Sequence, residues 1–168
     1  VAYASNSDFV YNDEFTILAD FKKDVGEELQ GGRLIYKSGS YIITIGADGV
    51  SATIFTSKKL FTLSAAGVGI NDSDWHRIAV TFSGETGRAK LFVDGVVVDQ
   101  EVGLLGAVQV GSVRNALYIG GPFGDSFGGL VDNVLFAGEQ LLPRNIAAAD
   151  PMASWAKNGP LYSPVVAG

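Results

Sequence analysis

The sequence predicts an all-β sandwich, and three observations carry the prediction. About ten short runs of apolar and β-branched residues are separated by turn residues at roughly 8–12-residue spacing, which is typical of sandwiches. Asp94-Gly95 stands between two such runs, and this pair is a strong hairpin signal because a type I′ turn needs positive φ at both central positions. Helical signals are confined to residues 141–150, so the strand–helix alternation of a parallel sheet is absent.

The composition limits the class of protein. A chain of 168 residues is expected to form one domain with a substantial core. It has 22 glycines and no cysteine, which favours many tight turns and excludes disulfides and thiolate metal sites. The net charge of −6 argues against a nucleic-acid partner, and no apolar run is long enough for a membrane span. A start at Val1, without an initiator Met, indicates a piece of a longer protein.

The first half of the chain reads as a series of strands. In residues 15–21, alternation places Phe15, Ile17, Ala19 and Phe21 on one face. The charged stretch 22–32 ends in Gly-Gly and is expected to be a loop. Further strands are predicted at residues 33–38, 41–45, 50–56 and 60–64, with turns at Gly39-Ser40 and at residues 47–49.

Residues 71–100 form the most distinctive stretch, a predicted antiparallel meander of three strands around which the rest should pack. A glycine-interrupted segment follows at 102–114, then a strand at 116–119, a long loop at 120–126 and a last strand series at 127–136. Val131 and Val134 are three apart, which breaks the two-residue alternation and predicts a bulge. Pro143 suits the first turn of a short helix over 141–150, with a stop at Asp150-Pro151. We expect a sandwich over 1–150 and an extended tail or linker over 151–168.

Four motifs follow one another along the chain: Asp-Trp-His-Arg-Ile-Ala-Val-Thr-Phe at 74–82, Lys-Leu-Phe-Val-Asp-Gly at 90–95, Leu-Tyr-Ile-Gly-Gly at 117–121 and Phe-Gly-Gly-Leu-Val-Asp-Asn-Val at 127–134. In this order they resemble the laminin-G-like domains of the concanavalin A-like lectin/glucanase superfamily, and the resemblance covers residues 15–150. It implies a jelly-roll sandwich of two antiparallel sheets with a short helical turn after the last strand. Members of the superfamily bind sugars, bind proteins or hydrolyse polysaccharides, so the fold does not fix the function.

Catalysis is disfavoured by the residues. The glucanases of the superfamily place two Glu and an Asp at alternate positions of one strand, and this chain has no Glu-x-Asp-x-x-Glu run. His76, the only histidine, has no neighbouring nucleophile and orienting group that would make a triad. Its favoured role is structural, and Trp75 beside it is expected in the core. An atypical hydrolase or lyase is kept as the least favoured hypothesis.

The resemblance also implies a structural Ca²⁺. Relatives often bind it at an acidic residue of the last strand, which corresponds to Asp132, with carbonyls from the N-terminal segment and an early turn; Asn6, Asp8 and Gly39 match these. Calcium takes six to eight oxygens, carbonyls included, so one or two carboxylates suffice. The alternative is that Asp132 bonds a backbone amide. Weaker alternative ligands are Asp72, Asp74, Asp125 and the pair Asp13-Glu14.

A glycan site needs aromatic faces and convergent polar groups. Alternation directs one set of strand residues to the core: Leu34, Tyr36, Ile54, Ile78, Val80, Phe82, Leu91, Val93, Leu117 and Ile119. It exposes the other set on sheet surfaces: Lys37, Thr53, Phe55, Arg77, Thr81, Phe92 and Tyr118. Phe55, Phe92 and Tyr118 are the predicted platform, Arg77 or Lys37 its polar partner, and Phe123 the rim contact in the glycine-rich loop.

The sequence therefore favours a non-catalytic, carbohydrate-binding module of a larger secreted or surface protein, with a glycan or polysaccharide as partner. The alternative is an adhesion or structural domain, for example of an adhesin or phage fibre, that contacts a protein or neighbouring domains. In that case the exposed aromatics would belong to a flat interface rather than to a sugar site.

Overall fold

The computed structural model describes residues 2–3, 9, 11–24, 31–111, 114–122 and 124–147. The predicted tail at 151–168 and the predicted helix stop at Asp150-Pro151 lie outside these residues. In the described part of the chain, no helix has the length and apolar character needed to cross a membrane.

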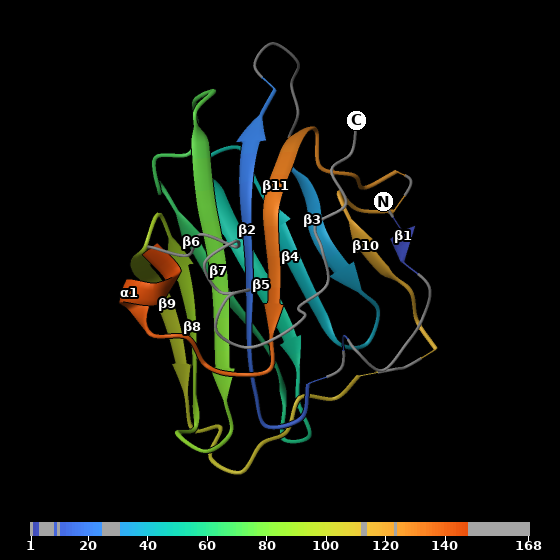
Figure 1. Cartoon of the computed structure of the whole chain (residues 1–168), viewed down its shortest axis with the longest axis vertical. Helices are drawn as coiled ribbons and strands as arrows, with labels where there is room; N and C mark the ends of the chain where they lie inside the picture. The colour runs from blue at the N-terminus through green and yellow to red at the C-terminus, as the bar shows by residue number, and fades with distance from the viewer. Residues whose placement is uncertain are drawn as a thin grey trace, which may run out of the picture.

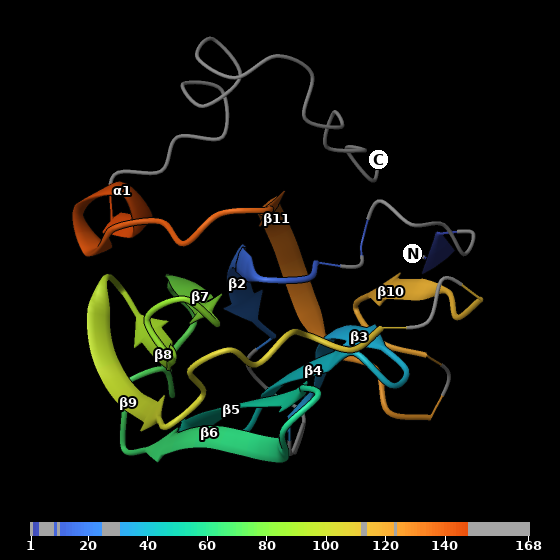
Figure 2. The same cartoon turned by 90° about the horizontal axis from the view of Figure 1, so that it is seen from below.

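Two antiparallel sheets pack face to face, which confirms the predicted all-β sandwich (Figures 1 and 2). The six-stranded sheet has the order β1-β10-β3-β4-β5-β6 and the five-stranded sheet the order β11-β2-β7-β8-β9. The strands of the first are β1 (Ala2–Tyr3), β3 (Gly32–Lys37), β4 (Tyr41–Ile45), β5 (Gly49–Phe55), β6 (Leu60–Ala66) and β10 (Leu117–Ile119). Those of the second are β2 (Glu14–Lys23), β7 (Trp75–Ser83), β8 (Arg88–Val93), β9 (Val96–Val102) and β11 (Gly129–Ala137).

The predicted meander is β7-β8-β9, and β7 is the central strand of its sheet. The turn between β8 and β9 has φ of 50° at Asp94 and 80° at Gly95, as the predicted type I′ turn requires. At the far edge of the meander, β9 approaches β6 of the other sheet. Ser64 N donates to Asp99 Oδ2 at 2.8 Å, and Lys59 pairs with Glu101 at 2.7 Å, so these contacts close one side of the sandwich.

The core lies between the sheets and follows the predicted alternation of β2. Phe15, Ile17, Ala19 and Phe21 are all fully buried and belong to one cluster with residues from both sheets. The Phe15 ring stacks on Phe82 of β7 with the centroids 5.4 Å apart. Burial of this apolar surface is the main stabilising term of such a fold.

A second, smaller core lies on the outer face of the five-stranded sheet. The chain after β11 crosses this face to the helix α1 (Pro143–Ala147), which begins at Pro143 as predicted (Figure 1). The fully buried Thr16 hydroxyl holds the crossing segment, because it donates to Glu139 O and accepts from Leu141 N. Beneath it a buried cluster forms from Leu18, Ala79, Phe92, Leu135 and Ile146.

The strand pairing shifts register at three places. The pairing of β11 shifts between Asp132 and Leu135, which confirms the predicted bulge, and Asn133 there has φ of 50°. Two further shifts, in β3 between Arg33 and Ile35 and in β8 between Leu91 and Phe92, are not predicted by the sequence.

The two-residue strand β1, which pairs with β10, is also not predicted, because a strand this short carries no periodic signal.

Candidate binding site

A surface pocket of about 310 Å³ opens at one end of the five-stranded sheet. Its lining comes from β2, from the start of β7, from the β8–β9 turn and from the end of α1. The lining residues are Asp20, Trp75, His76, Arg77, Asp94, Gly95 and Ala147. Aromatic, acidic and basic side chains thus meet in one depression, which is the combination expected of a small-molecule site.

The ion pair between Asp20 and Arg77 forms the base of the pocket. These residues are direct neighbours on β2 and β7. Arg77 Nε donates to Asp20 Oδ1 at 2.5 Å and Nη2 to Oδ2 at 2.7 Å, a bidentate geometry. Arg77 Nη1 also donates to Ile146 O at 3.1 Å, so the pair ties the end of α1 to the sheet. The two side chains are only 18% and 14% exposed, which strengthens the attraction relative to a surface pair.

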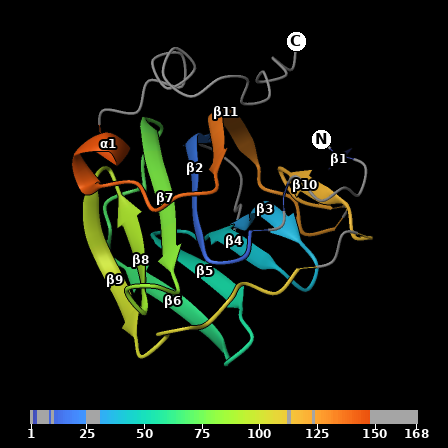
Figure 3. The ribbon, with the colours of Figure 1, turned by 60° about the horizontal axis from the view of Figure 1, so that its bottom comes forward.

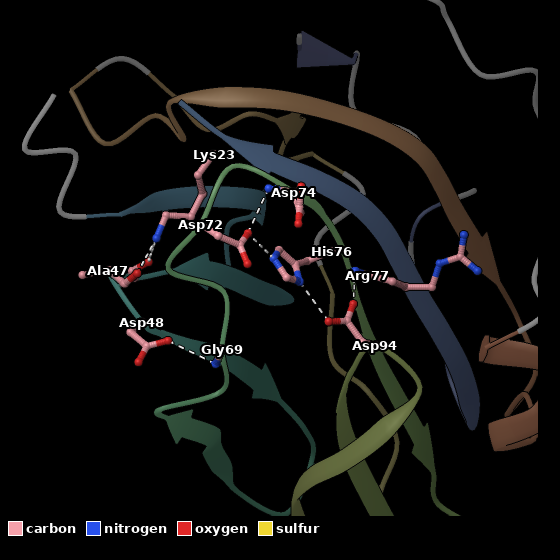
Figure 4. Close-up of polar contacts among 10 residues, drawn as sticks. Lys23, Ala47, Asp48, Gly69, Asp72, Asp74, His76, Arg77 and Asp94 are labelled. Carbon is pink, nitrogen blue, oxygen red and sulfur yellow. Dashed lines mark hydrogen bonds and ion pairs between the residues drawn. The ribbon is translucent and has the colours of Figure 1, made fainter. Parts of the chain in front are cut away.

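His76 is a lining residue whose ring stands between two carboxylates, Asp94 of the lining and Asp72 of the loop before β7 (Figure 4). Its Nδ1 lies 2.9 Å from Asp94 Oδ2 and its Nε2 lies 2.8 Å from Asp72 Oδ1. Ionised carboxylate oxygens only accept hydrogen bonds, so this geometry fits an imidazole that is protonated and donates from both nitrogens. Burial lowers the pKa of His76, but the hydrogen bonds to Asp94 and Asp72 outweigh it, and the pKa lies above its ordinary 6.5.

The same network fixes the backbone around His76. Asp94 Oδ1 accepts the backbone N–H of Arg77 at 2.8 Å, and Asp72 Oδ1 accepts that of Asp74 at 2.9 Å. The hydrogen bonds from His76 and from the Asp74 backbone hold the pKa of Asp72 below its ordinary value. The inner face of the His76 ring packs on Phe21, with the centroids 5.8 Å apart. The structural role predicted for His76 agrees with this placement.

The β8–β9 turn lies beside α1 (Figure 3), and both contribute residues to the pocket lining. A Cβ built on Gly95 would lie 2.9 Å from Ala147 Cβ, and Gly95 also has positive φ. A side chain at this position is therefore excluded both by contact and by backbone conformation. The glycine lets the turn approach the helix closely.

Trp75 supplies the aromatic surface of the pocket, and the expectation that it lies in the core is wrong. It is 48% exposed and pairs in register with Lys22, at the start of β7 and near the end of β2. The signal was available: Trp75 is two residues before Arg77, so the alternation that predicted an outward Arg77 puts Trp75 on the same face.

The three rings of the predicted aromatic platform do not form one surface. Phe55 and Tyr118 both lie half-buried on the outer face of the six-stranded sheet, but β10 and β5 are three strand spacings, or about 14 Å, apart. Tyr118 instead pairs with Tyr36, with ring centroids 6.1 Å apart, and the Arg33 guanidinium lies 4.7 Å from the Tyr36 ring. Arg77, the predicted polar partner, belongs to the other sheet.

Four predicted orientations are wrong. Phe92 is 1% exposed because α1 and the segment before it cover the outer face of its sheet, and Thr81 is buried on that face as well. Lys37 is fully buried and Tyr36 half-exposed because the bulge in β3 reverses the alternation after Arg33. The Lys37 ammonium donates to Asn115 O at 2.6 Å, and burial lowers its pKa. Phe123 lies outside the described residues.

The predicted calcium ligands do not converge within the described residues. Asp132 is exposed and its Oδ1 accepts the backbone N–H of Asn133 at 2.7 Å, the alternative role considered above. Gly39, with φ of 70°, lies in the β3–β4 turn of the other sheet, and Asn6 and Asp8 lie outside the described residues. In the described ranges no three acid or histidine side chains are grouped to hold a metal ion. The calcium site stays a prediction.

The weaker calcium candidates have other contacts. Asp72 bonds His76, Asp125 pairs with Arg33 at 2.9 Å, and Glu14 accepts from the Ser83 hydroxyl at 2.6 Å. Asp74 and Asp13 are exposed side chains.

The profile of the concanavalin A-like lectin/glucanases superfamily, in its laminin-G-like form, matches residues 1–147. No curated protein sequence matches the chain. Among solved structures, the Ruminococcus gnavus IT-sialidase CBM40 bound to alpha2,3 sialyllactose is similar with TM-score 0.61 and 18% identity, over 82% of this chain and 83% of that one.

Two further structures share the fold. Domains LG4-5 of the mouse laminin alpha1 chain match with TM-score 0.64 and 20% identity, over 81% of this chain. The binding domain of botulinum neurotoxin serotype G matches with TM-score 0.63 and 16% identity, over 88% of this chain. The match spans 39% of each of these two longer chains. At these identities the likeness concerns the fold alone. The chain belongs to the concanavalin A-like lectin/glucanases superfamily, as a laminin-G-like domain.

Proposed function

We propose that this domain is a non-catalytic carbohydrate-binding module and that the pocket beside Trp75 holds the glycan. The main observation behind this proposal is that Trp75 is 48% exposed and lies in a pocket with the fixed polar side chains of Asp94 and Arg77. Aromatic faces bind the apolar side of sugar rings and nearby polar groups orient the hydroxyls. The similar CBM40 structure, which holds sialyllactose, supports this class of ligand.

The state of the pocket carboxylates supports a non-catalytic role. Hydrolysis of a glycosidic bond by two carboxyl groups needs one that is protonated and able to act as an acid. The two carboxylates of the lining are Asp20, which is paired with Arg77, and Asp94, which bonds His76. Both are thus engaged as hydrogen-bond acceptors. A secreted or cell-surface location and a structural Ca²⁺ at Asp132 are parts of the same proposal.

A second candidate, contact with a protein or a neighbouring domain, is favoured by an aliphatic patch at the opposite end of the sandwich. Phe55 pairs with Leu60 in register, Val110 N donates to Phe55 O and Ser57 N donates to Val108 O. Leu60, Leu105, Val108 and Val110 are 59%, 65%, 37% and 38% exposed. Exposed aliphatic surface of this kind often marks an interaction site.

A glycan array with and without chelator tests the proposal, with three variants probed beside the parent chain. Trp75→Ala should abolish binding, whereas Phe55→Ala and Tyr118→Ala should leave it unchanged, because those two rings lie on the other sheet. Binding lost in Tyr118→Ala but kept in Trp75→Ala would move the site to the outer face of the six-stranded sheet. Absence of binding to every glycan in both conditions would refute the module function.

A further inference from the structure

The guanidinium of Arg77 is already committed within the pocket. Its side edge, Nε and Nη2, pairs with Asp20, and Nη1 donates to Ile146 O. A carboxylate on a ligand is recognised best by such a bidentate edge. To bind one here, Arg77 would have to leave Asp20, a largely buried acid that would lose its counter-charge.

Among the charged side chains of the lining, the one that remains open to a ligand is an acceptor. The Asp94 side chain is 49% exposed, and each of its oxygens has one partner among the described residues, Arg77 N and His76 Nδ1. A carboxylate offers about four acceptor positions. Asp94 can therefore receive hydrogen bonds from hydroxyl or ammonium groups, but not from another carboxylate.

The charges around the pocket balance. Within the lining, Asp20 and Asp94 offset Arg77 and the charged His76. Asp72 and Asp74 of the preceding loop are matched by Lys22, which pairs in register with Trp75, and by Lys23, whose ammonium donates to the carbonyls of Gly46 and Ala47. Selection against a carboxylate sugar therefore depends on Asp94 itself, the exposed carboxylate of the lining, because like charges facing each other across a binding surface weaken binding.

We infer that the Trp75 pocket selects neutral glycans, whose hydroxyl groups donate to Asp94, over glycans capped by a carboxylate sugar. This inference rests on the proposed function of the pocket. The single guanidinium in this chain's pocket lining, that of Arg77, is occupied by Asp20. A preference for neutral glycans would differ from the sialyllactose that the CBM40 structure of similar fold holds.

The test is a printed panel of matched pairs, each a neutral oligosaccharide and the same oligosaccharide capped by sialic acid, followed by calorimetry on each pair that contains a binder. The neutral member should bind at least about tenfold more tightly. Asp94→Asn should reduce this ratio to below about threefold, because it removes the charge while Asn-Gly still suits the type I′ turn. Asp125→Asn is the matched control: it removes one charge at the Arg33 pair, outside the pocket, and should keep the full ratio.

Three results would overturn the inference in different ways. Tighter binding of the sialylated members, with Trp75→Ala abolishing it, would leave the glycan-binding function standing and refute the selectivity. A ratio that falls equally in Asp94→Asn and Asp125→Asn would show that overall charge, and not Asp94, sets the preference. If no pair binds, both the selectivity and the proposed function fail.

Discussion

Nδ1 of His76 lies 2.9 Å from Oδ2 of Asp94, across the boundary between β7 and the β8–β9 turn. Asp72 completes the cluster from the loop before β7, at 2.8 Å from Nε2. One charged ring thereby joins the β8–β9 turn, which lines the pocket, to the loop before β7. This link depends on the proton that the two carboxylates hold on the ring.

The stability of the domain should fall as the pH rises above about 6.5, the ordinary pKa of histidine. The pKa of His76 is higher in the folded chain than its ordinary 6.5, so its contribution is full below about pH 6.5 and is lost as the pH rises through the folded value. Urea unfolding at several pH values measures this, and His76 is the only histidine of the chain. His76→Gln should lose the slope, and Asp74→Asn should retain it. Equal slopes in the parent and His76→Gln would contradict the charged ring.

The Asp20–Arg77 pair should show strong coupling in a double-mutant cycle. Arg77→Met leaves the largely buried Asp20 carboxylate without its counter-charge, with the Asn133 amide still donating to Oδ2, and should lower the free energy of unfolding by about 3 kcal/mol. Asp20→Asn should have a similar cost. The double variant should cost clearly less than the sum, because neither charge is then left alone. Denaturant unfolding of the parent chain, the two single variants and the double variant measures the coupling. If the two single losses of unfolding free energy add up to that of the double variant within about 0.5 kcal/mol, the pairing is contradicted.

Phe92 and Phe55 are both predicted from the sequence as rings of a ligand platform, but their substitution by alanine should differ sharply in its effect on stability. Phe92 is 1% exposed beneath α1, so Phe92→Ala should cost about 3–5 kcal/mol. Phe55 is only half-buried on an open sheet face, and Phe55→Ala should cost much less. Thermal and denaturant melts of both variants compare them. A small effect of Phe92→Ala would refute the second core.

Calcium at Asp132 predicts a metal-sensitive melting curve. An ion that binds only the folded chain must stabilise it, so added Ca²⁺ should raise the melting temperature and EDTA should lower it. Asp132→Asn should abolish the response, while Asp125→Asn, an acid in another loop, should keep it. An unchanged midpoint in EDTA would remove calcium from the proposal.

Much of the fold could be predicted because its signals are local. Asp94-Gly95 specified a type I′ turn, alternation in β2 placed Phe15 to Phe21 correctly, and the Val131–Val134 spacing located the bulge of β11. In each case one or two residues carry the signal, through backbone conformation or the two-residue period.

The site was harder to predict because long-range contacts decide it. Nothing near Phe92 in the sequence indicates that a segment about 50 residues later covers it. The bulge in β3 reversed Tyr36 and Lys37 without a glycine or proline to mark it. Trp75 is expected in the core, but it lies two residues before Arg77, so strand alternation puts it on the same outer face of the sheet, where it is exposed. Exposure depends on the layer that covers a face, and single-strand periodicity does not contain that information.

The fluorescence of Trp75 during a glycan titration tests the central claim most directly. The chain has two tryptophans, so Trp155→Phe leaves Trp75 as the only indole. For any glycan that the array identifies, its emission should change saturably, with the dissociation constant that calorimetry gives for the same variant. Glycan binding measured by calorimetry with no change in Trp75 emission would contradict the proposed site.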